Sequence, residues 1–462
     1  MITPHNIPRK PQYLTVDGVS DFFALFKKIE KHYQTCFYLE SLGEDSHISR
    51  YSLIGFSPSK IISAVGKTLT ITAPDNSSEQ YSSDNPYHLL RELIPQNSIS
   101  RKYCGGLTGF LGYDCMNYFE SSLAIQSSEL FETFKFGLYE DGLIFDKMTG
   151  EVSYFFYQNN RLSEIIQLIS VDYIGDGEFS ATLVGDTMTE AEHAAAVAKV
   201  KQDIIEGKIF QCEVGFKTRF KIKGDMILFY EALRKANPSP QMYYLKFGNQ
   251  KIVGASPELL FRLRQGEMET YPLAGTAKRG KNDQEDRELA NILLNDPKEI
   301  AEHNMLVDLH RNDIGRVAKF GTVKVRNLMD IKRFSHVQHI SSEIVGIMAD
   351  EHDMFSALAS NFPAGTLTGA PKIEAMKIIN TLEADGRGPY GGAVGHFGFN
   401  GDCTFAIPIR TLFANGEQAY VQTCGGNVFD SKPADEYQEI QRKLAGTYNV
   451  LKQFMSDDKA SA

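Results

Sequence analysis

Two pairs of glutamates, Glu299/Glu302 and Glu436/Glu439, have the types and spacing that could do chemistry in this chain. Each pair follows a proline at an expected helix start, and a spacing of three places both carboxylates on one face of a helix, one turn apart. Like charges so placed repel each other, and a hard divalent cation offsets that repulsion. Because Mg²⁺ prefers carboxylate oxygen, the two pairs predict a magnesium site.

A solvated helix face is the alternative interpretation of the same spacing. The pair Glu285/Glu288 has this spacing within the charged run KNDQEDRE, where we expect ordinary surface. Because charge runs are usually solvated, the spacing alone favours the surface for all three pairs. The neighbouring motifs therefore have to decide whether the first two pairs bind a metal.

Composition limits the class of protein. The chain has 462 residues and a net charge of −10 at pH 7, which predicts a globular protein and argues against a nucleic-acid partner. Its six cysteines form no C-x-x-C pair, as expected for reduced thiols rather than a disulfide framework or a zinc site. No apolar run is long enough to cross a membrane, and the N-terminus lacks the apolar stretch of a signal peptide. We therefore expect a cytoplasmic protein without a membrane partner.

Helices are needed to position the glutamates, and the pattern predicts one at about 297–311 and a final one after Pro433. Elsewhere strand-like and helical runs alternate without a regular βα period, and no G-x-G-x-x-G opens a helix. This disfavours a Rossmann fold or a (β/α)₈ barrel and favours a layered α+β fold. The predicted segments are an N-terminal region (1–165), a connector (166–186), a catalytic region (187–455) and a disordered tail (456–462).

Several further segments are rich in Gly, Pro, Thr and paired charges, which is unusual for purely structural sequence. Glycine permits close backbone approach to a ligand, and backbone N–H groups in Gly-rich turns can hold an anion. Arg410 lies beside an apolar run, and such an arginine often binds a carboxylate. A tight turn or a structural ion pair remains the alternative for each. The segments are PLAGTAKRG (272–280), LVDLHRNDIGRV (306–317), VQHISSEIVG (337–346), FPAGTLTGAPK (362–372), GRGPYGGAVG (386–395) and IRT (409–411).

Taken together, these segments resemble the chorismate-utilising enzymes. The resemblance covers about 190–450, and it extends to the N-terminal third through YLES (38–41), RYSLIGFSP (50–58) and GGLTGFLGYD (105–114), as in the branch that makes anthranilate or aminodeoxychorismate. It implies a two-lobed α/β sandwich with the active site in a deep cleft.

The resemblance also implies a role for the glutamate pairs. Glu302 and Glu439 match the family's Mg²⁺ ligands, and the ion chelates the ring carboxylate of chorismate. Glu299 and Glu436 match residues that bind metal-bound water or take part in proton transfer. Which member of each pair contacts the metal stays open at this point.

Two residues without acid–base chemistry of their own indicate the reaction. In the isochorismate and salicylate branch, a lysine at the position of Gln211 activates water for attack at C2, which a glutamine cannot do. In many aminodeoxychorismate synthases a lysine stands at the position of Ala274. The pair therefore favours the anthranilate-forming branch, in which ammonia adds at C2, the C4 hydroxyl leaves, and pyruvate is eliminated.

The remaining catalytic and substrate-binding residues follow from the resemblance alone. Glu299 is the candidate for proton delivery to the departing hydroxyl, and His339 is assigned to the elimination. The family usually has A-G-A-G-I-V where this chain has Thr-Cys-Gly-Gly-Asn-Val, so Cys424 narrows a turn where backbone approaches substrate. The residues expected to bind substrate are Thr366, Tyr390, Arg410, Cys424, Gly425, Gly426 and Lys443.

A partner and a regulator are also expected. No cysteine lies in the G-x-C-x-G of class-I amidotransferases, so we expect a separate glutamine amidotransferase small subunit that supplies ammonia, and hence a hetero-oligomer. Tryptophan inhibits the related enzymes near L-E-S and N-P-S-P-x-M segments. The matching residues here are Leu39, Glu40, Ser41, Asn237, Pro238, Ser239, Met242 and Tyr243, with Gln241 and Tyr243 replacing the family's Tyr and Phe.

Two alternatives stay open from the sequence. Some aminodeoxychorismate synthases of the folate branch lack the lysine, so Ala274 does not exclude that reaction. A non-catalytic tryptophan-binding relative is the second, although intact glutamate pairs and His339 argue against it.

Overall fold

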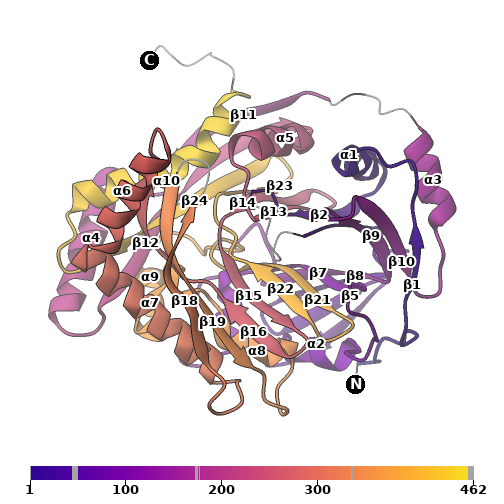
Figure 1. Ribbon diagram of the computed structural model, residues 1–462, viewed down its shortest axis with the longest axis horizontal. Coiled ribbons are helices and arrows are strands. Elements are labelled where there is room, and N and C mark those ends of the chain that lie inside the picture. Colours follow the sequence, from indigo (N-terminus) through magenta and orange to yellow (C-terminus); the bar gives the residue numbers. More distant parts are fainter. Residues whose placement is uncertain (1, 44–49, 172–174, 176, 334–336, 456–462) are drawn as a thin grey trace.

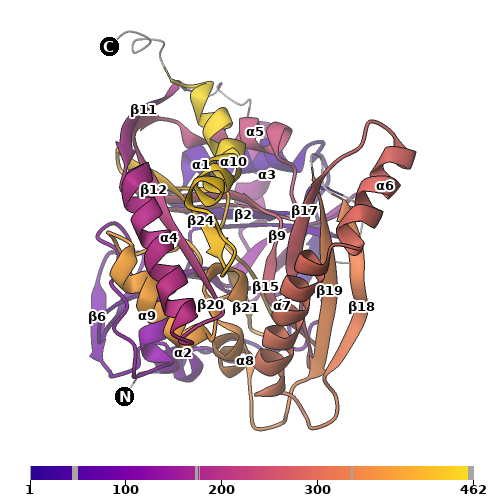
Figure 2. The same cartoon turned by 90° about the vertical axis from the view of Figure 1, so that its left-hand side faces the viewer.

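A computed structural model describes residues 2–43, 50–171, 175, 177–333 and 337–455. The predicted tail, 456–462, lies outside the described residues. Two large antiparallel sheets dominate the fold, and helices cover their outer sides and ends (Figures 1 and 2). The predicted layered α+β architecture is confirmed.

The first sheet runs across most of the chain, with strands from the N-terminal third beside strands from the C-terminal half. In spatial order it comprises β1 (Gln12–Thr15), β10 (Glu151–Phe156), β9 (Asp141–Asp146), β3 (Tyr51–Phe56), β2 (Thr35–Glu40), β13 (Gln241–Phe247), β14 (Gln250–Ser256), β23 (Thr411–Asn415), β24 (Gln418–Asn427), β12 (Gln211–Gly224) and β11 (Phe179–Asp186), with β20 (Gly369–Ala370) also paired to β12.

The second sheet is mixed in the same way along the chain. Its order is β17 (Leu273–Lys278), β19 (Val337–Ile347), β16 (Glu267–Thr270), β15 (Leu259–Arg264), β22 (Cys403–Ala406), β21 (Ala393–Gly398), β7 (Gly106–Leu111), β8 (Phe134–Tyr139), β4 (Lys60–Val65), β5 (Thr68–Thr72) and β6 (Ser78–Ser82), with β18 (Lys324–Arg333) on β19. Strands on both sides of the predicted connector thus share both sheets, and the division into four segments stays a prediction.

The helices pack on both sheets. They are α1 (Phe22–His32), α2 (His88–Leu93), α3 (Leu162–Ser170), α4 (Glu190–Ile205), α5 (Met226–Ala236), α6 (Asp283–Leu294), α7 (Pro297–Gly315), α8 (Met354–Asn361), α9 (Lys372–Leu382) and α10 (Pro433–Lys452), with 3₁₀ turns η1 (Tyr113–Tyr118) and η2 (Gly365–Leu367). Figure 2 shows the side where α4 and α10 lie on the β12–β24 end of the first sheet, with α7 along β17 and β19 of the second. No helix among the described residues has the length and apolarity to span a membrane.

The two helices that carry the glutamate pairs begin as their sequences predict. Asp296 caps α7 by accepting hydrogen bonds from the backbone N–H groups of Lys298 and Glu299, and Pro297 occupies the first helical turn. In α10, Pro433 again fills the first turn, and acidic residues follow it, as the helix dipole favours. The local sequence therefore fixes where each carboxylate pair begins.

Two buried cores hold the layers together. One lies between the sheets, and the other lies between the first sheet and helices α1, α5 and α10. Strand β13 supplies both, because alternate side chains point to opposite faces: Tyr243 and Leu245 join the inter-sheet core, while Met242 and Tyr244 face the helices.

The chain passes from one sheet to the other at two places that lie side by side. Strand β14 of the first sheet leads into β15 of the second, and β22 of the second leads into β23 of the first. The crossings bond to each other, because Ile407 N–H donates to the Glu258 carbonyl at 3.1 Å and Ala255 N–H to the Arg410 carbonyl at 3.3 Å. Glu258 and Arg410 are thereby held in neighbouring crossings, with Arg410 directly before β23.

Candidate active site

The four predicted metal residues come together from α7 and α10. Burial raises the pKa of Glu302, and the charges of Glu299 and Glu439 raise it further. Burial likewise raises the pKa of Glu299 and of Glu436, each with a contribution from Glu439. The two helices therefore place their carboxylates in one field of mutual repulsion.

Glu439 differs from its neighbours because a lysine is paired with it. Burial acts to raise the pKa of this carboxyl, but the Lys443 ammonium, 2.8 Å from its Oε1, holds the pKa below the ordinary value. Lys443 also donates to the carbonyl of Cys424 at 3.1 Å. The predicted substrate residue Lys443 thus joins the metal-candidate helix to β24, and 46% of its side chain stays open to solvent.

The donor set fits an oxygen-binding divalent cation, although it is not arranged as a closed shell. No three acidic, histidine or cysteine side chains of the described residues stand close enough to hold an ion as they are. The buried Oε2 of Glu436 has no hydrogen-bond partner among the described residues, and uncompensated carboxylates of this kind are costly. Carboxylate oxygens are the ligands that Mg²⁺ takes, so a cation could relieve both the repulsion and the unpaired oxygen.

A buried carboxylate that the sequence pattern did not indicate lies beside this cluster. Glu213 on β12 accepts a hydrogen bond from Gln211 Nε2 at 3.1 Å and one from the Cys424 thiol at 3.3 Å. Burial raises its pKa to about 7, against the influence of Lys443. A single glutamate in a strand has no spacing signal, and its thiol partner lies 211 residues away.

Glu258 is a second buried carboxylate that sequence reasoning missed. Its Oε1 accepts from the Thr366 hydroxyl at 2.9 Å, and burial raises its pKa to about 7. The signal was a charged residue inside the otherwise apolar stretch GASPELLF, which is typical of a functional carboxyl. The predicted residue Thr366 is therefore a direct partner of this group.

Arg410 stands at the neighbouring crossing in a strained conformation. Its φ is +51°, a region that costs a non-glycine residue about 1 kcal/mol or more. Burial lowers its pKa, with Glu258 opposing, and its guanidinium makes no hydrogen bond or salt bridge to the rest of the described chain. A cation held in this way is suited to an anionic ligand.

The backbone of Cys424–Gly426, predicted to bind substrate, has one edge that is not paired with another strand. Strand β23 pairs with β24 only as far as Tyr420, so the edge of Cys424–Gly426 that faces away from β12 has no strand partner in the described ranges. The buried Tyr390 hydroxyl donates to Cys424 Sγ at 3.2 Å, which puts Tyr390 in the same group. The predicted turn is therefore wrong: Cys424–Gly426 lies within strand β24, and the Cys424 thiol belongs to a buried polar network.

The second sheet contributes His339 and Ala274 from adjacent strands. Nδ1 of His339 lies 2.7 Å from the Gly275 carbonyl and must carry the proton, because a carbonyl only accepts. Burial lowers the pKa of His339 to about 4, so the ring is neutral at pH 7 and Nε2 is its accepting nitrogen. Ala274 is buried opposite Ile340.

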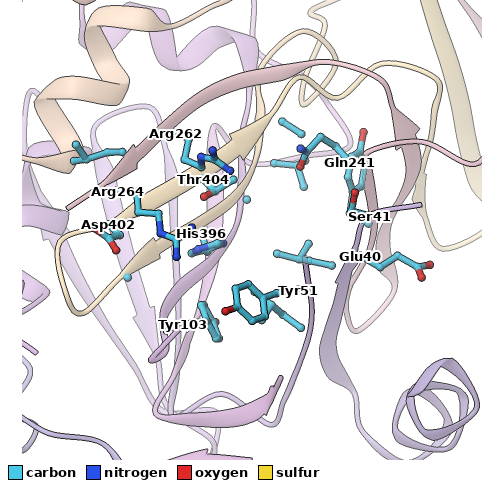
Figure 3. A pocket seen from close by; sticks show the side chains of 18 of the residues that line it. Glu40, Ser41, Tyr51, Tyr103, Gln241, Arg262, Arg264, His396, Asp402 and Thr404 are labelled. Atoms are coloured by element: carbon cyan, nitrogen blue, oxygen red, sulfur yellow. The ribbon is translucent and has the colours of Figure 1, made fainter. Parts of the chain in front are cut away.

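The residues predicted to bind tryptophan divide into two groups. Leu39, Ser41, Met242 and Tyr243 line a cavity of about 170 Å³ between the sheets, and Gln241 lines it too (Figure 3). The buried Ser41 hydroxyl has no hydrogen-bond partner among the described residues.

The other group turns away from the cavity or lies outside its lining. The Glu40 carboxylate points away from it (Figure 3) and is bonded by Tyr38, Tyr230 and Arg234. Asn237 donates to the Gly446 carbonyl at 2.6 Å, and the segment Asn237–Ser239 does not line the cavity. A regulatory role for these residues stays a prediction.

Comparison with known proteins places this arrangement in a family. The family of chorismate binding enzymes matches residues 34–448. The chain is 51% identical to anthranilate synthase component 1 of Leptospira biflexa, over 96% of this chain and 97% of the relative, and 42% identical to the Methanothermobacter thermautotrophicus protein of that name, over 91% and 90%.

Solved structures agree. The crystal structure of anthranilate synthase component I from Streptococcus pneumoniae superposes with a TM-score of 0.78 at 30% identity, covering 88% of this chain and 94% of that one. The menaquinone-specific isochorismate synthase of Escherichia coli shares the fold, with a TM-score of 0.71 at 17% identity over 97% and 96%. The chain belongs to the family of chorismate binding enzymes.

Proposed function

We propose that this chain is the chorismate-converting subunit of an anthranilate synthase, which forms anthranilate and pyruvate from chorismate and ammonia. The relatives of that name support the proposal over nearly the whole chain. The observation that carries the choice of reaction is that Gln211 and Ala274 provide neither a base for water nor an amine for covalent attack. With activated water and a side-chain amine both excluded, ammonia is the remaining nucleophile.

Mg²⁺ is the proposed cofactor, held by Glu302 and Glu439 with Glu299 and Glu436 in support. When bound, the ion supplies electrophilic stabilisation of charge on the ring carboxylate. The repulsion among the carboxylates and the unpaired Oε2 of Glu436 support this assignment. Lys443, paired to Glu439, adds positive charge beside the same carboxylates.

Glu258 is the donor whose pKa is better matched to delivering a proton to the departing C4 hydroxyl. A general acid works best when its pKa lies near the working pH, and burial brings this carboxyl to about 7. The Thr366 hydroxyl orients it. Glu299 remains the second candidate, because its pKa is also raised by burial. His339, neutral with Nε2 as acceptor, is suited to take up the ring proton during elimination.

Arg410 is proposed to bind the enolpyruvyl carboxylate. It makes no ion pair or hydrogen bond within the described chain, and the open edge of Cys424–Gly426 offers backbone N–H groups nearby on β24. An arginine and a carboxylate form strong charge-assisted hydrogen bonds. Tyr390 supports this part of β24 through its hydrogen bond to Cys424.

A separate amidotransferase subunit is the proposed source of ammonia. All six cysteines are buried free thiols, and none lies in the G-x-C-x-G context that a glutaminase nucleophile needs. We therefore expect a hetero-oligomer. Glutamine-dependent turnover by this chain alone would overturn that part of the proposal.

Tryptophan is the proposed regulator, bound in the cavity lined by Leu39, Ser41, Met242 and Tyr243. The unpartnered Ser41 hydroxyl supports a polar ligand there, and Leu39 and Tyr243, which pack in the inter-sheet core, supply apolar contact.

One assay tests the reaction. The chain is incubated with chorismate, Mg²⁺ and ammonium at alkaline pH, and anthranilate is followed by its fluorescence. Anthranilate with equimolar pyruvate supports the proposal. An amino product that yields an aromatic compound only after a lyase is added indicates aminodeoxychorismate synthase instead, and no turnover of chorismate indicates a non-catalytic relative.

A further inference from the structure

The buried carboxylate of Glu213 has no role in the reaction described so far. Glu213 lies on β12, where its backbone N–H donates to the Thr368 carbonyl at 2.9 Å, two residues after Thr366, the partner of Glu258. The charges of Glu302 and Glu439 of the metal-candidate cluster raise its pKa, and its own charge raises the pKa of Glu258. Its position is therefore central, although no spacing pattern pointed to it.

The surroundings neutralise this carboxylate only in part: the Lys443 ammonium lowers its pKa, but burial outweighs that charge, and no salt bridge joins the two side chains among the described residues. Its two hydrogen bonds come from an amide and from a thiol, which is a weak donor, and the side chain is 6% exposed. A buried carboxylate without a paired cation costs free energy, and an apolar residue on this strand would not. Proteins keep such conflicts mainly at functional sites.

The backbone opposite makes room for the group. Gly426 is the cross-strand partner of Glu213. A Cβ on Gly426 would lie 2.5 Å from Glu213 Oε1 and 2.8 Å from Gln211 Nε2, so only glycine allows both side chains to lie across the strand. The same glycine belongs to the open edge of β24 beside which substrate is proposed to bind.

Gln211 and Glu213 together offer what a small amine needs. The amide oxygen of Gln211 and the carboxylate of Glu213 accept N–H hydrogen bonds, and the carboxylate attracts an ammonium ion. Neither can itself attack a ring carbon as an amine would. The pair is polar, buried and next to both the metal-candidate carboxylates and the proposed proton donor Glu258.

We propose that Gln211 and Glu213 form the binding position for the nitrogen nucleophile, with Glu213 as the base that takes the proton which the nitrogen must lose. This inference rests on the proposed function. Ammonia forms the C–N bond while the C4–O bond breaks, and the leaving hydroxyl departs as water with the proton of Glu258. The new C–NH₃⁺ group then transfers one proton to the Glu213 carboxylate, and solvent returns both carboxyls to their starting states.

The test replaces Glu213 with glutamine, which keeps the shape and the hydrogen bond to Gln211 but removes the base. With ammonium as nitrogen source, we expect kcat to fall by about 100-fold, the low end of the effect of a general base. KM for chorismate should change less than about twofold, because Arg410, proposed to bind the enolpyruvyl carboxylate, and the metal-candidate carboxylates are unchanged. The exposed Glu288→Gln variant is the matched control and should behave as wild type.

Three further measurements separate a base from a structural residue. Glu213→Asp retains a carboxylate and should recover at least a tenth of wild-type kcat. When rates are plotted against free ammonia, the low-pH limb of the wild-type profile should be absent in Glu213→Gln. Thermal unfolding should show Glu213→Gln to be at least as stable as wild type, because a buried charge has been removed.

Each outcome decides between distinct ideas. Wild-type activity with an unaffected Glu213→Gln variant overturns this inference and leaves the proposed function intact. Glu213→Asp no more active than Glu213→Gln also overturns it, because the charge would not be the property required. Absence of anthranilate from the wild type with ammonium instead removes the proposed function.

Discussion

Two buried glutamates on the same sheet, Glu40 and Glu213, differ in how their charge is compensated. Glu40, beside the inter-sheet cavity, accepts hydrogen bonds from Tyr38 and Tyr230, and Arg234 donates Nε–H at 2.6 Å and a second N–H at 3.0 Å. Among the described residues Glu213 accepts hydrogen bonds only from an amide and a thiol, and the charge of Lys443 offsets its burial only in part. Glu40 is part of a structural ion pair, whereas Glu213 is a buried carboxylate with no salt-bridge partner among the described residues.

The difference extends to the regions around them. At the cavity, Arg234 lies 4.0 Å from the ring centre of Phe23, so its cation has both a carboxylate and an aromatic face. At the candidate site, several carboxyls keep raised pKa values and Arg410 has no partner in the described chain. Compensated burial stabilises the fold, whereas uncompensated burial marks where substrate, metal and protons are expected.

Replacing the uncompensated carboxylate of Glu258 should have the largest effect, a loss of catalytic rate. We expect Glu258→Gln to lower kcat by about 10³-fold, because a general acid near the reaction pH contributes on that scale. The fold should tolerate the change, since the amide can still accept from Thr366. Steady-state anthranilate formation and circular dichroism measure the two effects, with Glu288→Gln as control. Activity within tenfold of wild type would assign the proton to another group, with Glu299 the first to test.

At the compensated carboxylate of Glu40, beside the cavity, we expect the opposite result: a loss of stability without a loss of activity. Glu40→Gln removes the buried carboxylate from its ion pair with the half-buried Arg234, which should lower the free energy of unfolding by about 3 kcal/mol. Activity per folded molecule should be retained with ammonium. Chemical denaturation measures the loss of stability. The matched control is Glu231→Gln, which removes the half-buried ion pair between Glu231 and Lys27 and should cost less than about 1 kcal/mol. A Glu40→Gln protein as stable as wild type would mean that the compensated ion pair does not stabilise the fold.

The pH dependence of stability should show the uncompensated charge directly. The pKa of Glu258 rises from 4.5 to about 7 on folding, so the folded state holds its proton more tightly. Its stabilising contribution is full below pH 4.5 and is lost as pH rises through 7, up to about 3 kcal/mol. Denaturation of wild type without Mg²⁺ should therefore show falling stability across that window, with a shallower fall in Glu258→Gln. Parallel curves for the two proteins contradict the raised pKa.

Much of this could be predicted from sequence, and the reason for the rest is physical. Helix caps and the i, i+3 spacing are local, so the helices bearing Glu299/Glu302 and Glu436/Glu439 were predicted at their observed starts. Glu258 depends on Thr366, 108 residues away, and on a crossing between sheets, which no periodicity encodes.

Side-chain direction was the other limit of the sequence patterns. Strand alternation turns Glu40 toward the helices and leaves Ser41 at the cavity, although both lie in the same L-E-S motif (Figure 3). The motif alone assigned both residues to one site, and only the structure separates them.

The smallest effect is expected at the cavity itself, where Gln241→Tyr should strengthen inhibition by tryptophan. Gln241 and Tyr51 both line the cavity, and an aromatic ring at position 241 adds a face for an indole worth about 0.5–1.5 kcal/mol, or roughly twofold to tenfold in Ki. Inhibition titrations at fixed chorismate measure Ki, and an unchanged KM for chorismate shows that the active site is undisturbed. Weaker inhibition in this variant would mean that the cavity holds tryptophan through polar contacts that Gln241 supplies. The inter-sheet cavity would then recognise its ligand through unpaired polar groups such as the Ser41 hydroxyl. Unpaired polar groups are also what distinguishes the candidate active site.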